Sequence, residues 1–242
     1  MIQVIDFHKA YGETVAVAGL SFAVGPGQIL GLLGHNGAGK TTTMRAISGI
    51  IPATSGRLIV AGHDVAADPV AAKRELAYVP DDPKLFDTLT IWEHLEFIAA
   101  AYRVTDYRPV GERLLEQFEL TSKRDTLAQE LSRGMRQKVA ICCAYLHDPK
   151  AILFDEPLTG LDPRGIRTMK ESVIRSAANG KAVVVSSHLL SLVEDLCTHL
   201  LILNHGVSLF CGKAQDARGA FDNLDGDASL EEVFFRATET VK

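Results

Sequence analysis

Gly34-His35-Asn36-Gly37-Ala38-Gly39-Lys40-Thr41 is the stretch that decides the fold of this chain. An apolar run, 28–33, precedes it, and a helix-forming run, 41–48, follows it. Glycines between a strand and a helix let successive backbone N–H groups turn toward phosphate oxygens, and the helix N-terminus adds its positive end. Lys40 would then reach the β- and γ-phosphates, and Thr41 would bind Mg²⁺. The stretch therefore predicts a nucleotide-binding loop, with residues 34–42, Thr42 included, against the phosphates.

The composition is that of a folded chain with an acidic balance. The 242 residues are 47% apolar and 23% charged, with a net charge of −5. This length allows one large domain or a core with an inserted lobe. The acidic balance argues against nucleic-acid binding, which usually comes with basic excess. The four cysteines lack metal-ligand spacing, and we find neither a leader peptide nor a membrane-length apolar run. We therefore predict a cytoplasmic protein with reduced, buried thiols.

Strand and helix patterns alternate around the loop, and one helical segment interrupts them. Strands are predicted at 2–7, 15–24, 28–33, 57–61, 77–80, 151–154, 181–186, 200–203 and 207–210, the last two as a hairpin. Helices are predicted at 41–48, 68–76, 136–146, 163–178, 189–197 and 230–237. From Thr90 to Leu120 the pattern is helical, opening with a capping box between Thr90 and Glu93. We predict an α/β core, 1–84 and 149–215, an inserted helical subdomain, 85–148, and a C-terminal extension, 216–242.

Polar side chains follow two buried strands of the predicted core. Asp155 and Glu156 end the apolar run that begins at residue 151. Because ligands bind at the carboxyl ends of parallel strands, Asp155 is placed to hold Mg²⁺ and Glu156 to orient or deprotonate an attacking water. His188 follows the next apolar strand, which we expect to lie beside the first. We predict that His188 contacts a γ-phosphate as a sensor rather than as the base.

A second anion site is suggested by the start of the helix after residue 131. Ser132 is a natural N-cap, and Gly134 leaves backbone N–H groups open at the positive helix end. From local sequence alone, an ordinary capped helix explains these residues better than a binding site does. The order of the motifs along the chain resolves the choice.

Six elements in sequence give the chain a specific resemblance to the nucleotide-binding subunits of ATP-binding cassette (ABC) transporters, over nearly its whole length. They are Tyr11 before the loop, the Walker A loop at 34–41, the signature at 131–135, the Walker B strand at 152–156, the D-loop at 160–162 and the switch histidine, His188. The resemblance implies an α/β fold with a P-loop NTPase core and mostly parallel sheet, an N-terminal antiparallel β subdomain and an inserted α-helical subdomain.

The resemblance also implies a mechanism and partners. Two cassettes, in a homodimer or a heterodimer, would stack head to tail and trap each ATP, with its Mg²⁺, between one Walker A loop and the other signature helix. Ser132 and Gly134 would then bind the γ-phosphate in trans, Tyr11 would stack on adenine, and Asp162 would bridge the dimer. Glu156 would act as general base. ATP hydrolysis would power a separate transmembrane permease, which would hold the protein on the inner face of the membrane.

The chain departs from the family pattern in two places, at residue 81 and within the signature. Asp81 stands where the family usually has glutamine, and it keeps an oxygen ligand for Mg²⁺ while adding a charge. Arg133 and Met135 stand where the common signature has glycine and glutamine. Both departures are similar to those of bacterial export-type cassettes made as separate subunits, so we expect export. The transported substrate is not encoded in this chain.

Two further choices stay open. Leu85, Phe86 and Leu89 lie where such subunits receive the coupling helix of the permease, and they form either an exposed apolar dock or part of the helical core. The alternative function is a soluble ABC-type ATPase acting on nucleic acid or ribosomes. Such proteins usually carry a coiled-coil insertion or a second cassette, for which 242 residues leave no room. A P-loop kinase or GTP switch would not explain the signature.

Overall fold

A computed structural model describes residues 1–188, 190–220, 232 and 234 of the chain. The described strands are β1 (Ile2–Tyr11), β2 (Thr14–Val24), β3 (Ile29–Leu33), β4 (Ser55–Val60), β5 (His63–Asp64), β6 (Leu76–Val79), β7 (Ala151–Asp155), β8 (Ala182–Ser186), β9 (His199–Asn204) and β10 (Val207–Lys213). The described α-helices are α1 (Lys40–Ile47), α2 (Pro69–Arg74), α3 (Ile91–Tyr102), α4 (Tyr107–Gln117), α5 (Arg133–Leu146), α6 (Pro163–Ala178) and α7 (Leu190–Leu196). The helix predicted at 230–237 lies outside the described residues, apart from 232 and 234.

A six-stranded, mostly parallel sheet forms the centre of the molecule. Its strand order is β10-β9-β3-β8-β7-β6, with β10 antiparallel to β9 and the other neighbours parallel. β3, β7 and β8 are buried along their whole length, as expected for apolar runs covered on both faces. The prediction that the strands before Glu156 and His188 are neighbours is confirmed, because Asp155 pairs with Ser186.

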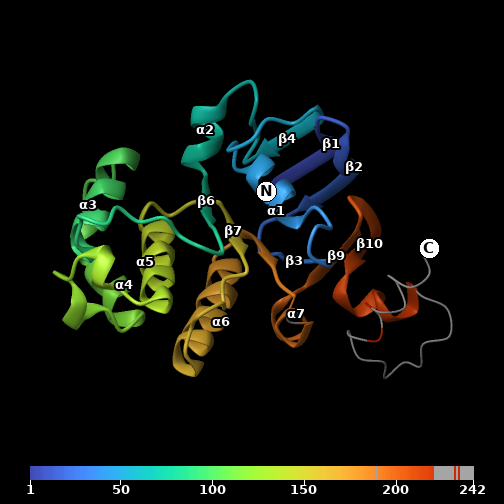
Figure 1. Ribbon diagram of the computed structural model, residues 1–242. Helices are drawn as coiled ribbons and strands as arrows, with labels where there is room; N and C mark the ends of the chain where they lie inside the picture. The colour runs from blue at the N-terminus through green and yellow to red at the C-terminus, as the bar shows by residue number, and fades with distance from the viewer. Residues whose placement is uncertain (189, 221–231, 233, 235–242) are drawn as a thin grey trace.

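Alternate residues of the central strands enter two different cores. Leu30, Leu32 and Leu153 point to a core shared with α1 and a four-stranded antiparallel sheet of order β2-β1-β4-β5. Ile152 and Phe154 point to the other core, which α5, α6 and α7 cover. Figure 1 shows α1 between the two sheets and α6 and α7 on the opposite side of the central sheet. This period-two alternation makes the central sheet a wall between the two cores.

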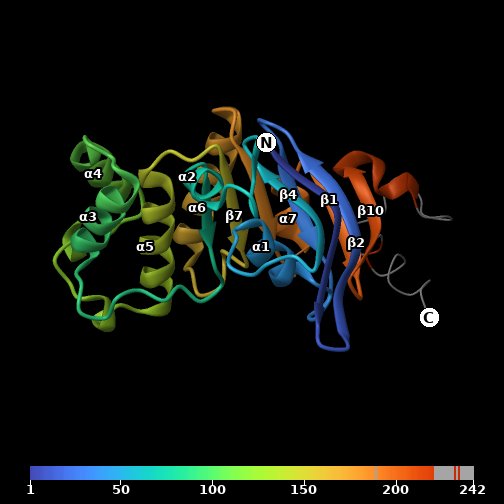
Figure 2. The ribbon, with the colours of Figure 1, turned by 90° about the horizontal axis from the view of Figure 1, so that it is seen from above.

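Helices α3, α4 and α5 pack against one another at the β6 end of the central sheet. Figure 1 and Figure 2 show them together at one side of the molecule, away from β1, β2 and β10. The predicted capping box at Thr90 is present, since its hydroxyl accepts from the Glu93 N–H and the Glu93 carboxylate accepts from the Thr90 N–H. The helical pattern predicted through Leu120 is interrupted where Arg103, at the C-cap of α3, adopts a left-handed conformation with φ of 58°.

Other expectations need smaller corrections. The two-residue strand β5 was not predicted, because two residues carry no periodic signal. The thiols were expected to be buried, but Cys211 is exposed on the edge strand β10. Across the described ranges, no helix combines the length and the apolar character required to cross a bilayer.

Candidate functional site

The loop between β3 and α1 is held in shape by close backbone contacts. At Gly39, φ is 102°, and a Cβ there would lie 2.8 Å from the carbonyl oxygen of Ala16. Only glycine fits such a position without strain. The Lys40 side chain is buried and donates to the carbonyl oxygens of Gly34, at 2.6 Å, and His35, at 3.2 Å. Burial lowers the pKa of Lys40, although the charges of Glu156 and Asp155 oppose that shift.

Asp155 lies at the carboxyl end of β7 and is oriented by both neighbouring strands. It is only 2% exposed. Its Oδ1 accepts from the Ser186 hydroxyl at 2.5 Å, and its Oδ2 accepts from the Tyr78 hydroxyl at 3.2 Å. Burial, together with the Asp155 charge, raises the pKa of Tyr78 to about 12, so Tyr78 stays a neutral donor. Sequence reasoning missed Tyr78 and Ser186, because only the strand order brings them to Asp155.

The structure brings Glu156 and His188 together. The Glu156 Oε2 lies 2.8 Å from His188 Nδ1, and the His188 backbone N–H also donates to it at 3.4 Å. Glu156 has a φ of 49°, a backbone conformation that residues other than glycine rarely adopt. Its backbone N–H donates to the carbonyl oxygen of Ser186 at 3.2 Å, which fixes the turn after β7. The histidine predicted as a phosphate sensor is therefore also a partner of the predicted base.

Two adjoining cavities surround the loop. The smaller, of about 220 Å³, is lined by Ala16, His35, Asn36, Gly37, Gly39, Lys40, Thr41, Thr42, Asp81, Asp155 and Glu156. The larger, of about 530 Å³, is lined by Gly34, His35, Asn36, Asp81, Arg133, Glu156, Thr159, Ser187, His188, Leu190 and Phe234. One or both cavities are lined by most of the predicted phosphate-binding residues. They are also lined by both predicted catalytic residues and all three predicted metal ligands. The Phe234 ring lies 4.9 Å from the His35 ring, a contact that the sequence did not indicate.

The remaining predicted residues lie at helix starts or away from these cavities. The Ser132 hydroxyl caps α5 and accepts from the Met135 N–H at 3.3 Å. The Asp162 carboxylate caps α6 and accepts from the Gly165 N–H at 2.6 Å. Tyr11 ends β1 and is 50% exposed, and its ring centroid lies 4.8 Å from Lys9 Nζ. Tyr11 is not among the described residues that line either cavity.

Gly134 joins α5 to the loop before α6. A Cβ at Gly134 would lie 2.4 Å from the carbonyl oxygen of Gly160, which is closer than real Cβ atoms approach. Gly160 has a φ of 81°, and its open side lies against the Arg133 side chain. The predicted signature and D-loop are thus in direct contact within one chain.

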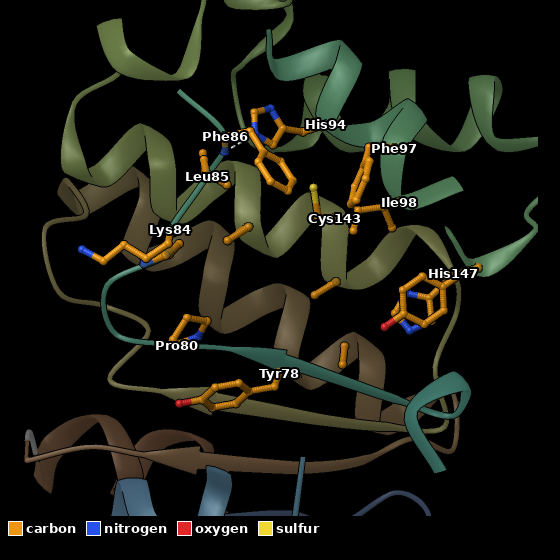
Figure 3. A pocket seen from close by; sticks show the side chains of 15 residues that line it. Tyr78, Pro80, Lys84, Leu85, Phe86, His94, Phe97, Ile98, Cys143 and His147 are labelled. Carbon is orange, nitrogen blue, oxygen red and sulfur yellow. Dashed lines mark hydrogen bonds between the residues drawn. The ribbon is translucent and has the colours of Figure 1, made fainter. Parts of the chain in front are cut away.

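A separate apolar groove lies between β6, the segment that follows it, and helices α3 and α5. It has a volume of about 250 Å³ and is lined by Ala77, Tyr78, Pro80, Pro83, Lys84, Leu85, Phe86, His94, Phe97, Ile98, Tyr102, Ala140, Cys143, Ala144 and His147. Figure 3 shows Phe86, His94 and Phe97 over one part of the groove and His147 at its other end. Phe86 and Phe97 are 54% and 50% exposed, with ring centroids 5.1 Å apart. Leu85 also packs against the helical core, as the second of the two interpretations expects.

A glycine-rich loop between a parallel strand and a helix, with an acidic pair at the end of a neighbouring strand, defines a P-loop nucleotide site. The family model described as "ABC transporter" matches residues 17–159. The chain is 33% identical over 242 residues to the ABC-type transporter ATP-binding protein EcsA of Bacillus subtilis, covering 99% of this chain and 97% of that protein. It is 34% identical to the linearmycin resistance ATP-binding protein LnrL of the same organism, covering 96% of this chain and 74% of that protein.

A solved structure supports the same assignment. A structure described as the ATP-binding subunit of an ABC transporter matches with a TM-score of 0.93 and 33% identity, over 98% of this chain and 99% of that one. The chain therefore belongs to the ABC transporter family, as an ATP-binding subunit. It has the P-loop NTPase fold, binds ATP and is an ATPase. Subunits of this kind pair with transmembrane permease components.

Proposed function

We propose that the chain hydrolyses ATP as one half of a cassette dimer and thereby powers export through a separate permease on the inner face of the membrane. The observation that carries the proposal is the 2.8 Å contact between Glu156 Oε2 and His188 Nδ1, next to the loop that holds Lys40. A general base must have a carboxylate oxygen near the attacking water and a partner that fixes its orientation. His188 is such a partner for Glu156, and Glu156 lines the same cavity as Lys40, where the attacking water would lie beside the phosphates.

The chain's own residues suit each task of the reaction. Backbone N–H groups of residues 34–42 and the Lys40 ammonium would hold the phosphates, and Glu156 would accept the proton of the attacking water. His188 orients Glu156 and would contact the γ-phosphate through its ring. Tyr11, exposed on the β1–β2 hairpin, would stack on adenine. We propose no nucleic-acid substrate.

The donor set fits Mg²⁺. Thr41, Asp81 and Asp155 offer oxygen atoms around one cavity, and Mg²⁺ is usually bound by one or two carboxylates together with substrate phosphates. The hydroxyls of Ser186 and Tyr78 hold the Asp155 carboxylate in a fixed orientation. When bound there, the ion would offset the negative charge of the triphosphate during hydrolysis.

The composite site is supported by the exposure and the position of the signature residues within one chain. Ser132 is exposed, and α5 begins beside the larger cavity, where Arg133 forms part of the lining. Ser132 and Gly134 would complete the site on the γ-phosphate of the partner cassette. Asp162, at the start of α6 and 60% exposed, would reach across the same interface. With either a second copy or a related cassette as the partner, these residues would form this chain's side of the interface.

The apolar groove supports a permease contact. An exposed groove with two half-exposed phenylalanines suits a short amphipathic helix that inserts apolar side chains. We propose that this groove receives a helix of the permease. Export is supported by Asp81 and Arg133, and by the description of LnrL as a resistance protein, since removal of a compound from the cell is one means of resisting it.

The dimer is tested with Glu156→Gln, which keeps the shape of the side chain but removes the base. We expect hydrolysis to fall at least about 100-fold, as is typical for loss of a general base, and the variant to run as a dimer with ATP and Mg²⁺ on size exclusion with light scattering. Glu171→Gln is the matched control, since Glu171 lies on α6 and pairs with Arg167 at 2.9 Å. A Glu156→Gln protein that binds ATP but stays monomeric would contradict the composite site.

The permease is tested by affinity capture of the tagged protein from detergent-solubilised membranes of its own cells, followed by mass spectrometry. A stoichiometric polytopic partner supports the proposal. Recovery with ribosomes or DNA instead would support the alternative function on nucleic acid.

A further inference from the structure

Two of the residues that depart from the family pattern, Asp81 and Arg133, contact each other. Asp81 follows β6 and Arg133 begins α5, 52 residues later in the sequence. Arg133 Nη2 donates to Asp81 Oδ1 at 3.3 Å. A negative charge in place of glutamine and a positive charge in place of glycine therefore compensate each other in space. This pairing does not follow from either motif read alone.

The pair lies at the junction of the two cavities. Asp81 lines both of them, whereas Arg133 lines the larger one and Lys40 lines the smaller one. The residues that line the smaller cavity include three carboxylates, those of Asp81, Asp155 and Glu156, and one ammonium, that of Lys40. An uncompensated carboxylate at position 81 would repel an incoming triphosphate. Arg133 offsets that charge.

Packing holds Arg133 in place for this contact. A Cβ on Gly160 would lie 3.3 Å from both Cγ and Cδ of Arg133, so the aliphatic part of the side chain lies along the open face of that glycine. One turn further along α5, the Gln137 side chain donates to the carbonyl oxygen of Pro80 at 3.4 Å. Helix α5 is thus joined twice to the loop that carries Asp81.

The pair is also suited to open. The side chains of Arg133 and Asp81 are 54% and 53% exposed. Ion pairs that remain in contact with water contribute little net stability, so a competing charge can separate them. A cation bound in the smaller cavity would compete with Arg133 for the Asp81 carboxylate.

We propose that Asp81 and Arg133 form an exchangeable ion pair that lets nucleotide bind when no Mg²⁺ is present and frees Asp81 for the metal when Mg²⁺ is present. Arg133 neutralises Asp81 while no cation is present, and Asp81 turns from Arg133 toward the metal-binding side of the cavity when Mg-nucleotide binds. Arg133 is thus a positioning residue that acts through Asp81. The inference rests on the Mg²⁺ site proposed above, and it adds a link between that site and the start of α5.

The test measures binding, without hydrolysis. The dissociation constant of the β,γ-imido analogue of ATP is determined by calorimetry, in EDTA and in excess Mg²⁺, for wild type, Arg133→Met, Asp81→Asn and the double variant. We expect Arg133→Met to weaken binding in EDTA about fivefold, which corresponds to about 1 kcal/mol, the upper range for an exposed pair. In Mg²⁺ the same variant should stay within about twofold of wild type.

The double variant decides whether Arg133 acts through Asp81. In the Asp81→Asn background, Arg133→Met should change the dissociation constant in EDTA by less than about 1.5-fold, since no carboxylate remains to be neutralised. Arg133→Lys should retain most of the wild-type affinity. Arg136→Met is the matched control: it removes a charge from the same helix, but Arg136 pairs with Asp87 at 3.8 Å instead.

Two results would overturn the inference. An equal loss from Arg133→Met in the wild-type and Asp81→Asn backgrounds would mean that Arg133 contacts the phosphates directly, and an unchanged Arg133→Met affinity in EDTA would mean that the pair has no role in binding. If wild type itself binds the analogue equally well with and without Mg²⁺, the proposed metal site fails together with the pair. If wild type binds the analogue more tightly in Mg²⁺ but either of the first two results is found, only the role of the ion pair is rejected and the proposed metal site stands.

Discussion

Gly134→Ala tests the close contact between α5 and the loop before α6. The added Cβ would lie 2.4 Å from the Gly160 carbonyl oxygen and 3.3 Å from its carbonyl carbon. An ordinary contact requires about 3.4 Å or more, so the helix start and the loop must separate by about 1 Å. Both obstructing atoms belong to the backbone, so no rotamer change relieves the clash.

The magnitude follows from two opposing terms. Overpacking of this kind costs about 1–3 kcal/mol. Alanine is the better helix former, by up to about 1 kcal/mol. The net loss of folding stability therefore lies between about 0 and 3 kcal/mol, with a central value of about 1–2 kcal/mol, which for a chain of this size lowers the melting temperature by about 2–8 °C. Because the start of α5 shifts, ATP-dependent dimerisation should also weaken.

The assay is differential scanning calorimetry without nucleotide, together with light scattering of the Glu156→Gln background with ATP and Mg²⁺. Gly111→Ala is the matched control, because its Cβ would meet only side-chain atoms of Leu95 and Trp92, at 3.3–3.4 Å. If Gly134→Ala melts within about 1 °C of wild type, a shift that corresponds to well under 1 kcal/mol, and dimerises normally, the close contact is not a constraint and the reasoning is refuted.

Two further predictions concern the apolar groove. His147 stacks on Tyr102 at 3.8 Å, and burial lowers its pKa below the ordinary value of 6.5. As the pH falls through 6.5, His147 takes up a proton in the unfolded chain but not in the folded chain, so the free energy of unfolding falls. The melting temperature of His147→Phe should therefore fall less between pH 7 and pH 5 than that of wild type. Phe86→Glu should reduce the recovery of the permease in affinity capture more than about tenfold, since burying an unpaired charge is costly. The ATPase activity of the variant without permease should stay within about twofold of wild type. Equal recovery of the permease would contradict the docking proposal.

Much of the fold was predictable because it rests on local patterns. The apolar runs before Asp155 and His188 indicated fully buried parallel strands, and the neighbouring positions of those strands are confirmed. The break between α3 and α4 was missed, since it depends on a left-handed Arg103 rather than on glycine or proline. Nothing in the local sequence distinguishes such a residue from one inside a helix.

The site was predictable only where its residues belong to a single motif of the sequence. The loop and the acidic pair have fixed spacing along the chain, so their positions followed from the sequence. Tyr78 and Ser186 reach Asp155 only because β6 and β8 flank β7, and strand order is a property of the whole fold. The contact between Asp81 and Arg133 was missed for the same reason: each was noted as unusual, and only the structure joins them.

The backbone at Glu156 carries a further consequence. A residue other than glycine held at φ of 49° costs about 1–2 kcal/mol relative to an ordinary conformation. Glycine would relieve that strain, but it would remove the carboxylate that faces His188. If Glu156 is the general base, as proposed above, position 156 is one where relief of backbone strain and activity favour different residues. A selection for thermal stability alone would tend to change this position, and a screen for stabilised variants of this chain should hold it fixed.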